Sequence, residues 1–336
     1  MELLNNIKKN AIFLFVVTII ILIVLLKDNF GQIINALSSM DYKFIAIAVL
    51  FFFFYIFLKS IANYITINNK NKVTLKEAFK HNLIVQFFNG ITPFSTGGQP
   101  MEIYMLTEHD IKPVEATNIS IQNFIFYQIA LVLYGILAVG YNYFFGIFPN
   151  SPFLRELVLL GFVINTLVAV FLLTILISKK LTKNIGDFFI NIFFKIKIIK
   201  DKEKIQNKIY NKLDEFHESA TLIRKRKGLF ATGVFLNFLS LTCLYIIPIF
   251  IVFSLHDYTS LNIADTITAS AYTLLVSSFV PIPGASGGVE YSFLQFFGNF
   301  LGQNVLPAIL IVWRFITYYL GMIIGALAFS FEKKVK

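Results

Sequence analysis

The sequence is poor in charged residues and in cysteine. Asp, Glu, Lys and Arg make up 14% of its 336 residues, whereas about 25% is usual in a soluble domain. The single cysteine, Cys243, cannot form an internal disulfide, and it has no metal-ligand spacing to the four scattered histidines. We therefore predict no metal site, and a large soluble domain is excluded as the main body of the protein.

Motifs of common catalytic and nucleotide-binding sites are also missing. The chain has no P-loop, dinucleotide fingerprint, nucleophile elbow or HExxH pattern, so we predict no cofactor. The net charge of +10 does not indicate a nucleic-acid partner, because that would need a basic groove on a soluble domain. Here the basic residues lie between apolar segments, where membrane topology and anionic lipids account for them.

Apolar sequence is what the chain has in abundance. Hydrophobic residues make up 57% of it, and a bilayer core ~30 Å thick needs ~20 of them for each crossing helix. The six runs that we predict to be full transmembrane helices cover residues 11–26, 44–67, 116–141, 157–177, 229–255 and 307–331. Pro248 predicts a kink in the fifth of these helices. Lys59 lies near the end of the second, from where we expect its side chain to reach the membrane interface.

Residues 178–228 differ from the rest of the chain. They hold 14 lysines and arginines against six acidic residues, and apolar residues recur at helical spacing between Ile185 and Ile196. We predict an amphipathic helix on the membrane surface, followed by a charged helix at about residues 202–227. The segment is either a solvated loop anchored by its charge or a docking element for a cytosolic partner.

The distribution of lysine and arginine predicts the orientation of the chain. Residues 178–228 and the lysines of residues 68–81 belong on the cytoplasmic side by the positive-inside rule. Both termini then lie in the cytoplasm. Heavy use of Ile, Lys, Asn and Phe is typical of an AT-rich bacterial genome, so we expect a multi-pass protein of a bacterial cytoplasmic (inner) membrane.

A short pattern occurs twice, each time inside an apolar segment. Residues 93–98 read PFSTGG and are followed by Glu102, and residues 283–288 read PGASGG and are followed by Glu290. Proline removes a backbone donor, and Gly-Gly admits conformations that other residues avoid, so no ordinary membrane helix runs through either stretch. Interrupted segments at matching places in two halves of a chain are typical of a transporter binding site near mid-membrane.

The interrupted segments, residues 82–106 and 263–300, must also fit the topology. The orientation above requires the first to enter and leave on the cytoplasmic side and the second on the outer side. We therefore predict an all-α polytopic membrane protein with two oppositely oriented re-entrant helical hairpins, as in an inverted repeat. Residues 1–336 would form one membrane domain, with broken-helix halves at about 44–177 and 229–331. If the hairpin arms nearly span, the helix count rises to eight or more.

The tips of these hairpins have the chemistry of an anion site. Non-helical backbone at membrane depth is tolerated only beside protein or a water-filled cavity. Free N–H groups at a helix start, together with the helix dipole, favour an anion such as a phosphate. Ser95, Thr96 and Ser286 add hydroxyl donors. The alternative is that the glycines serve only close packing at the tips.

Three charged residues lie at membrane depth near the tips. Carboxylates there are costly and usually functional, so Glu102 and Glu290 could bind a cationic group, carry a proton or cap hairpin amides. Arg314 lies roughly 12 Å along the last helix. Its candidate partners are Glu290, Glu102 or a lipid phosphate, and a purely structural Arg–Glu pair is the alternative. Polar side chains that could line a cavity nearby are Gln99, Tyr104, Gln122, Asn123, Tyr127 and Gln128.

These motifs resemble those of a known family. Residues 89–104, NGITPFSTGGQPMEIY, resemble the first signature of the lysylphosphatidylglycerol synthase transmembrane family, also called the flippase-like domain family. Residues 281–290, PIPGASGGVE, resemble the second signature, and Arg314 falls where the family has an arginine in the next helix. The resemblance covers essentially the whole chain, and its two signatures in this order and spacing are fairly specific.

The resemblance implies a role in lipid translocation. In full-length aminoacyl-phosphatidylglycerol synthases, this membrane region moves the lipid that a fused cytosolic domain makes. The present sequence ends at Lys336, just after the last predicted helix, so we do not expect the aminoacyl transfer activity to carry over.

Together, the residues and the resemblance predict a flippase-like protein whose partner is a membrane phospholipid. It would move an anionic or aminoacylated phospholipid, or another phosphate-bearing lipid, between leaflets. The predicted headgroup-binding residues are Thr92, Pro93, Ser95, Thr96, Gly97, Gly98, Gln99, Glu102, Tyr104, Pro283, Ser286, Gly287, Gly288, Glu290 and Arg314. One alternative is an intramembrane lipid-modifying transferase or the membrane half of a phosphatidylglycerol lysyltransferase. Another is a scaffold that binds a cytosolic partner through residues 178–228.

Overall fold

The described part of the chain is helical throughout. The computed structural model describes residues 30–67, 73–148, 152–196, 201–224 and 226–331. Five of its helices are long and apolar enough to cross a membrane, namely Tyr42–Ile67, Pro113–Phe145, Phe153–Ile177, Lys227–Phe253 and Leu306–Ser330. They confirm five of the predicted membrane helices, and the remaining one, at residues 11–26, lies outside the described residues.

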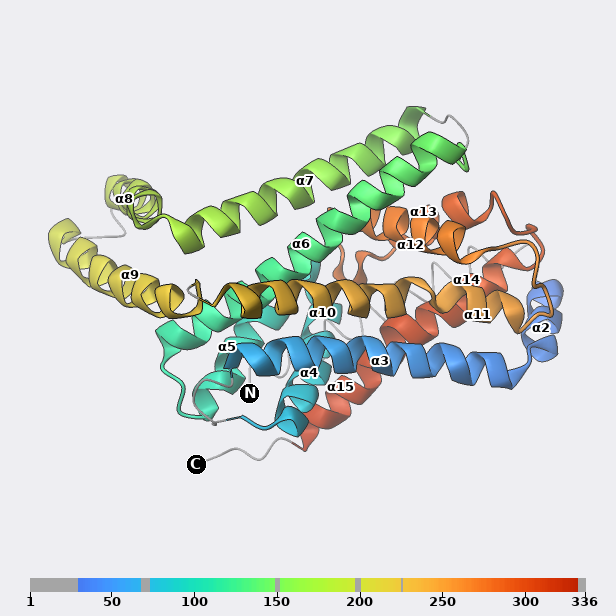
Figure 1. Ribbon diagram of the computed structural model, residues 1–336, viewed down its shortest axis with the longest axis horizontal. Helices are drawn as coiled ribbons and strands as arrows, with labels where there is room; N and C mark the ends of the chain where they lie inside the picture. Colours follow the sequence, from blue (N-terminus) through green and yellow to red (C-terminus); the bar gives the residue numbers. More distant parts are fainter. Residues whose placement is uncertain (1–29, 68–72, 149–151, 197–200, 225, 332–336) are drawn as a thin grey trace.

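Two of these spans lie side by side along the long axis of the molecule (Figure 1). Helix α3 (Tyr42–Ile67) packs against the span made of α10 (Lys227–Tyr245) and α11 (Ile247–Phe253). The amide of Asp41 donates to the carbonyl of Ser254 at 2.8 Å, so α3 begins at the end of the bundle where α11 finishes. Pro248 lies in the first turn of α11, where the kink was predicted.

The remaining spans cross this pair. Helix α6 (Pro113–Phe145) ends at Gly146, whose φ of +59° is a left-handed cap that glycine adopts without strain, and α7 (Pro152–Ile177) returns beside it. The last span is interrupted. It comprises α14 (Leu306–Arg314), a π-helical turn η4 (Phe315–Tyr319) and α15 (Leu320–Ser330).

Both interrupted segments form helix–turn–helix hairpins. Their elements are α4 (Leu75–Gly90), η2 (Pro93–Ser95) and α5 (Gly98–Glu108) in the first, and α12 (Ile263–Ser277), η3 (Pro283–Ala285) and α13 (Gly288–Phe297) in the second. A capping residue marks the start of the first helix of each hairpin. The Thr74 hydroxyl accepts from the amide of Glu77, whose carboxylate accepts from the Thr74 amide at 2.7 Å. In the second hairpin, Asn262 caps α12 by accepting from the Asp265 amide at 2.8 Å.

The hairpins start at opposite ends of the bundle and their tips meet. Helix α4 follows the end of α3, whereas α12 follows the end of α11. Because the start of α3 and the end of α11 lie together, the two hairpins point toward each other, and η2 contacts η3. The arrangement has the opposed orientation that the positions of the lysines predicted.

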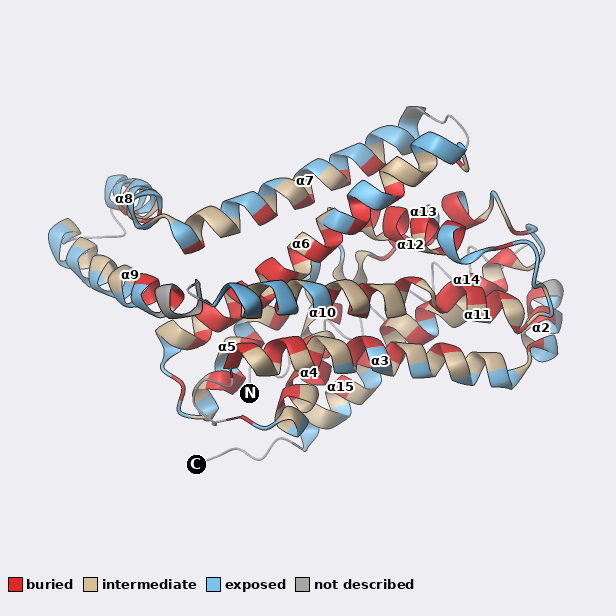
Figure 2. Cartoon of the chain, viewed as in Figure 1, coloured by how far each residue is buried: buried red, intermediate tan, exposed pale blue. Residues whose placement is uncertain are grey.

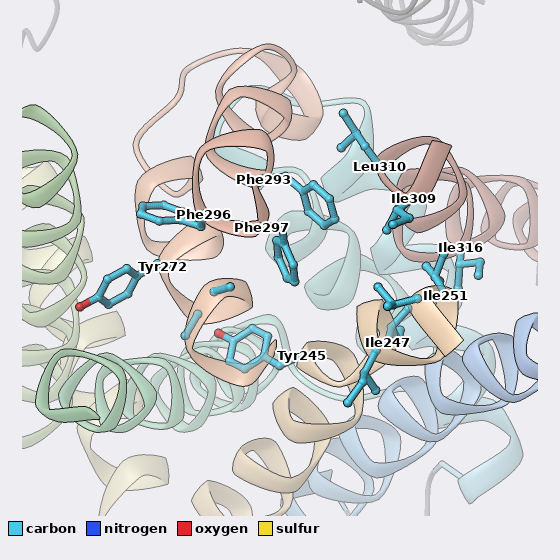
Figure 3. Packing of buried hydrophobic residues seen from close by; sticks show 14 of the residues in the cluster. Tyr245, Ile247, Ile251, Tyr272, Phe293, Phe296, Phe297, Ile309, Leu310 and Ile316 are labelled. Carbon is cyan, nitrogen blue, oxygen red and sulfur yellow. The ribbon is translucent and has the colours of Figure 1, made fainter. Parts of the chain in front are cut away.

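Aromatic and aliphatic side chains hold the second hairpin against the last span (Figure 3). The rings of Phe293 and Phe297 on α13 stack with centroids 4.2 Å apart, and Phe293 also stacks on Trp313 of α14 at 4.6 Å. Such pairs contribute more than their buried area alone. This packing places α14, and therefore Arg314 at its end, directly beside the hairpin.

Two further helices extend beyond the spans at one end of the molecule (Figure 1). They are α8 (Lys179–Lys195) and α9 (Lys202–Arg224), and they confirm the two helices predicted for residues 178–228. The ammonium groups of Lys179 and Lys183 each lie 3.0 Å from the same Asp214 oxygen. Much of α8 is exposed (Figure 2), including several phenylalanines. Its contact with the membrane surface stays a prediction.

A short helix, α2 (Phe30–Ser39), precedes the spans. Ile33 on α2 is buried at 2% exposure, and the helix packs on α14. Helix α2 leads directly into α3.

Candidate functional site

The two hairpin tips are joined by one tyrosine of the last span. The Tyr318 hydroxyl donates to the carbonyl of Gly90, at the end of α4, at 2.8 Å. The Tyr318 ring also packs directly against Gly284 in η3, where a Cβ atom would clash with it. Gly284 has a φ of +62°, so both its backbone conformation and its neighbour require glycine.

A cavity of about 740 Å³ opens between the hairpins. It is bounded by α3, both hairpins, α6, α7, α10 and the last span, which are elements far apart in the sequence. Ligand sites typically have volumes of about 300–1,000 Å³, so this cavity lies within the size range of a ligand site. Amide side chains dominate its polar lining, and they are Asn63, Asn82, Gln86, Asn89, Gln99, Asn123, Gln128 and Asn165. Among the described residues, the charged ones that line it are Lys59, Glu102 and Arg314.

Arg314 and Glu290 form a buried ion pair at the second tip. Nε of Arg314 lies 2.8 Å from Oε1 of Glu290, and the two side chains are 7% and 5% exposed. Nη2 of Arg314 donates to the carbonyl of Gly284 at 3.0 Å, and the guanidinium lies 4.5 Å from the centroid of the Tyr318 ring. Arg314 therefore ties the tip to the last span while still lining the cavity.

Glu102 on α5 is held by neutral donors instead. Its Oε1 accepts from the side-chain amides of Asn63 at 3.1 Å and Asn123 at 2.8 Å, and its Oε2 accepts from the Ser120 hydroxyl at 2.7 Å. The residue is 8% exposed. The carboxylate is thus fixed by α3 and α6 at once, and it joins the first hairpin to both spans.

Lys59 faces the cavity, and the expectation that it reaches the membrane interface is wrong. Its ammonium lies 5.5 Å from the centroid of the Tyr127 ring and 6.0 Å from that of Tyr55, which is within cation–π range. Glu102 lines the same cavity. Tyr55, Lys59 and Asn63 are spaced four residues apart, so α3 presents one polar face to the cavity.

The backbone amides of the tips are used within the hairpins. The Gly97 amide donates to the Thr92 hydroxyl at 2.8 Å, and the Gly98 amide to Oδ1 of Asn89 at 2.9 Å. In the second hairpin, the Gly287 amide donates to Oε2 of Glu290 at 2.6 Å. These donors hold the turns closed, so an anion could use them only in place of these bonds.

The predicted headgroup-binding residues divide into two groups. Those that line the cavity are Ser95, Thr96, Gln99, Glu102 and Arg314. Those outside its lining are Thr92, Pro93, Gly97, Gly98, Tyr104, Pro283, Ser286, Gly287, Gly288 and Glu290. Most of the second group builds the tips, and Tyr104 is 52% exposed. Headgroup binding by the first group stays a prediction.

Several residues that line the cavity were not among the predicted site residues. The largest omission is the polar face of α3, Tyr55, Lys59 and Asn63, together with Asn82, Gln86 and Asn89 on α4 and Tyr318 on the last span. A signal was present, because polar residues at intervals of three and four in an apolar helix mark one helix face. Of the further polar residues considered, Gln122 points elsewhere and bonds to Asn118.

The described residues hold no group of three or more His, Cys, Asp or Glu side chains that could bind a metal ion. The described lining of the cavity supplies two cationic side chains, one carboxylate and many neutral hydrogen-bonding groups. This combination suits a polar ligand that carries negative charge.

Comparison with known proteins identifies a matching family and several relatives. The sequence profile described as "Lysylphosphatidylglycerol synthase TM region" matches residues 11–325. An uncharacterized protein of Mycoplasma genitalium is 24% identical over 95% of this chain and 86% of its own length. A UPF0104 membrane protein of Archaeoglobus fulgidus is 23% identical over 78% of this chain and 79% of its own length.

A third relative, an uncharacterized protein of Mycoplasma pneumoniae, is 24% identical over 73% of this chain, and the match spans 66% of that protein. The profile match covers most of the chain, including both hairpins and Arg314. The chain belongs to the lysylphosphatidylglycerol synthase transmembrane-region family.

Proposed function

We propose that this protein moves a phosphate-bearing lipid between the leaflets of a membrane. The observation that carries the proposal is the cavity of about 740 Å³ between two opposed hairpin tips, lined by Lys59, Glu102 and Arg314 inside a bundle of apolar spans. A polar chamber at that depth is costly unless it serves a polar ligand. The family to which the chain belongs is named for membrane lipid chemistry, which supports a lipid as that ligand.

In this proposal the headgroup enters the cavity while the acyl chains stay outside, against the apolar surface of the spans. The phosphate lies between Lys59 and Arg314, and the hydroxyl of Ser95 donates to it. The Thr96 hydroxyl donates to the carbonyl of Pro93 at 3.0 Å, so it would contact the phosphate only in place of that bond. Both oxygens of Glu102 already accept hydrogen bonds, so we assign Glu102 to positioning α3 and α6 around the ligand. The sequence has no P-loop, so movement is down a gradient or coupled to an ion.

The test is lipid transfer in vesicles of defined composition. Purified protein is reconstituted with acyl-labelled fluorescent phosphatidylglycerol, and a membrane-impermeant reductant then bleaches the label in the outer leaflet. Wild-type protein should make nearly all the label accessible, whereas Arg314→Ala and Lys59→Met should leave the inner leaflet protected. Wild-type rates in both variants would discard the site assignment.

Matched controls separate the site from general effects of charge. Arg155 and Lys43 are exposed and lie outside the cavity lining, so Arg155→Ala and Lys43→Met should transfer lipid at the wild-type rate. Mass spectrometry of the recovered lipid is run in parallel. A covalently altered lipid with no transfer would replace translocation by a lipid-modifying reaction.

A further inference from the structure

We infer that one exposed face of α8 binds the surface of an anionic bilayer, in the leaflet at which α7 ends. The inference goes beyond lipid movement and does not depend on it. It rests on the faces of α8, on the place of this helix at the end of a membrane span, and on the charges beside its apolar face.

The first face of α8 packs on α9. Gly186 faces the side chains of Leu213 and Ile209 on α9, and Ile190, one turn further along, is 2% exposed. Residues four apart lie on the same side of a helix, so α9 covers this side of α8. The other sides of α8 are free of this contact.

The second face of α8 is apolar and exposed. Phe188 is 62% exposed and Phe189 is 51% exposed. The members of this face recur at helical spacing, and they are Leu181, Phe188, Phe189, Ile192 and Ile196. Contiguous apolar residues left exposed in this way mark an interaction surface. The apolar face of α8 therefore needs a partner.

The position of α8 identifies this partner. The α7 span ends at Ile177, and Ser178 caps α8 by accepting from the amide of Leu181 at 3.3 Å, so α8 begins one residue beyond the span. Figure 1 shows α8 nearly end-on, whereas α7 is seen along its length. Helix α8 thus crosses the direction of the spans where they leave the bilayer. An amphipathic helix at this depth and in this direction lies in the membrane interface.

Contacts with the bundle fix the direction of the apolar face. Lys179 and Lys183 of α8 both pair with Asp214 of α9 at 3.0 Å. Helix α9 is held in turn by α6, because the side-chain amide of Asn118 donates to the carbonyl of Phe216 at 2.8 Å in a buried position. The apolar face is therefore presented by a rigid support and cannot turn onto α9.

The third face of α8 is polar and basic, and it selects an anionic surface. It consists of Lys180, Asn184, Asn191 and Lys195, all of them exposed. The helix as a whole holds four lysines and one aspartate. Lysines beside an inserted apolar face extend toward the headgroups, and an anionic leaflet attracts them. A neutral leaflet would leave this charge without a counterpart.

The test measures the depth of α8 in the full-length protein. Cys243 is the sole cysteine and lies outside the cavity lining, so Cys243→Ser gives a background for one spin label. Labels are attached through Phe188→Cys on the apolar face, Asn184→Cys on the polar face and Asn207→Cys on α9. In vesicles containing phosphatidylglycerol, collisions with oxygen and with a water-soluble nickel chelate, present on both sides, are compared. The label at position 188 should be several-fold better shielded from nickel than those at 184 and 207.

Charge is tested in the same background. In vesicles of phosphatidylcholine alone, the label at position 188 should become more accessible to nickel. Lys180→Gln/Lys195→Gln should remove this difference between the two vesicle types. The matched control is Lys204→Gln/Lys208→Gln on α9, which removes the same charge from exposed positions and should keep the difference.

Nickel access at position 188 equal to that at 207 would show a face open to water, as a soluble protein partner requires, and would overturn the inference. Equal shielding in the two vesicle types, or the same loss in the α9 control, would overturn the choice of an anionic surface. A readout without a spin label is Phe188→Trp in a Trp313→Phe background, since Trp313 is the sole tryptophan. Brominated lipids should quench this tryptophan, and no quenching would refute insertion.

Discussion

Each hairpin has one buried carboxylate just beyond its Gly-Gly pair, but the two carboxylates have different partners. Glu290 pairs with Arg314 and also accepts from the amide of its own turn. Within the described part of the chain, Glu102 accepts only from neutral groups, which come from α3 and α6. The same local pattern has therefore become a charge pair in one half and a network of amides and a hydroxyl in the other.

The difference bears on how each hairpin is held. Desolvating an ion pair is costly, so removing one member leaves a buried charge without its counter-ion. A carboxylate held by neutral donors loses less with each donor removed, because the others remain. The strongest contact of the second tip is thus its buried ion pair, whereas the first carboxylate is held by several weaker contacts.

We expect the largest effect on this comparison from removing Arg314. Arg314→Ala leaves Glu290 buried at 5% exposure without its cation, and such a loss costs about 3–5 kcal/mol. Thermal unfolding of the purified protein should show a strongly lowered midpoint. The double variant Arg314→Met/Glu290→Gln should recover much of it, and a double variant as unstable as the single one would contradict the account.

Neutralising each carboxylate separately sharpens the comparison. Glu102→Gln keeps the size and one acceptor but places an NH₂ group against existing donors, for an expected loss of about 1–2 kcal/mol. Glu290→Gln should cost more, because it leaves the guanidinium of Arg314 unpaired. Both are measured by thermal unfolding under the same conditions. A larger loss for Glu102→Gln would reverse our assignment of the stronger contact.

The link between the halves can be removed with a single oxygen. Tyr318→Phe deletes the hydrogen bond to Gly90 but keeps the ring against Gly284, and it should cost about 1 kcal/mol. Hydrogen exchange should rise at the end of α4 while the second tip stays protected. Tyr319→Phe, one residue further on in the same turn, serves as a control for the loss of a hydroxyl.

The smallest effect is expected outside the spans, where an ion pair is exposed to water. Hydrogen bonds from Lys179 and Lys183 lower the pKa of Asp214 from its ordinary value of 3.8. Because the pKa of Asp214 is lowered, its ion pairs stabilise the folded protein at pH values above 3.8. This stabilisation is lost as the pH falls through the pKa that Asp214 has in the folded state. Asp214→Asn should slightly loosen the contact of α8 with α9 at neutral pH and match wild type at low pH, as measured by hydrogen exchange. An equal difference at both pH values would refute the assignment.

Local features of the sequence predicted much of the fold. Apolar runs located the described spans, Pro248 located the kink, and the two Pro/Gly-Gly stretches located the turns of the hairpins. Each of these depends on residues close together in the chain. The opposed entry of the hairpins followed from lysine positions, because charge bias constrains topology as a whole.

The site was less predictable, since it depends on packing between distant elements. Arg314 was expected to pair with Glu290, Glu102 or a lipid, and only the crossing of α13 and α14 selects Glu290. The prediction for Lys59 was wrong because it used only the position of this residue along the length of α3. It did not consider that Lys59 lies on the same helix face as Tyr55 and Asn63. Nothing local indicates that Asn63 and Ser120 hold the same carboxylate.

The π-helical turn Phe315–Tyr319 begins directly after Arg314 and contains Tyr318. A π turn holds one residue more than the α-helical repeat, so converting it to α-helix would swivel one part of the span by about 100° against the other. Arg314 contacts the tip of the second hairpin from one side of this joint, through the carbonyl of Gly284, and Tyr318 contacts the end of α4 in the first hairpin from within it. A change from π-helix to α-helix in the last span would therefore break both contacts together.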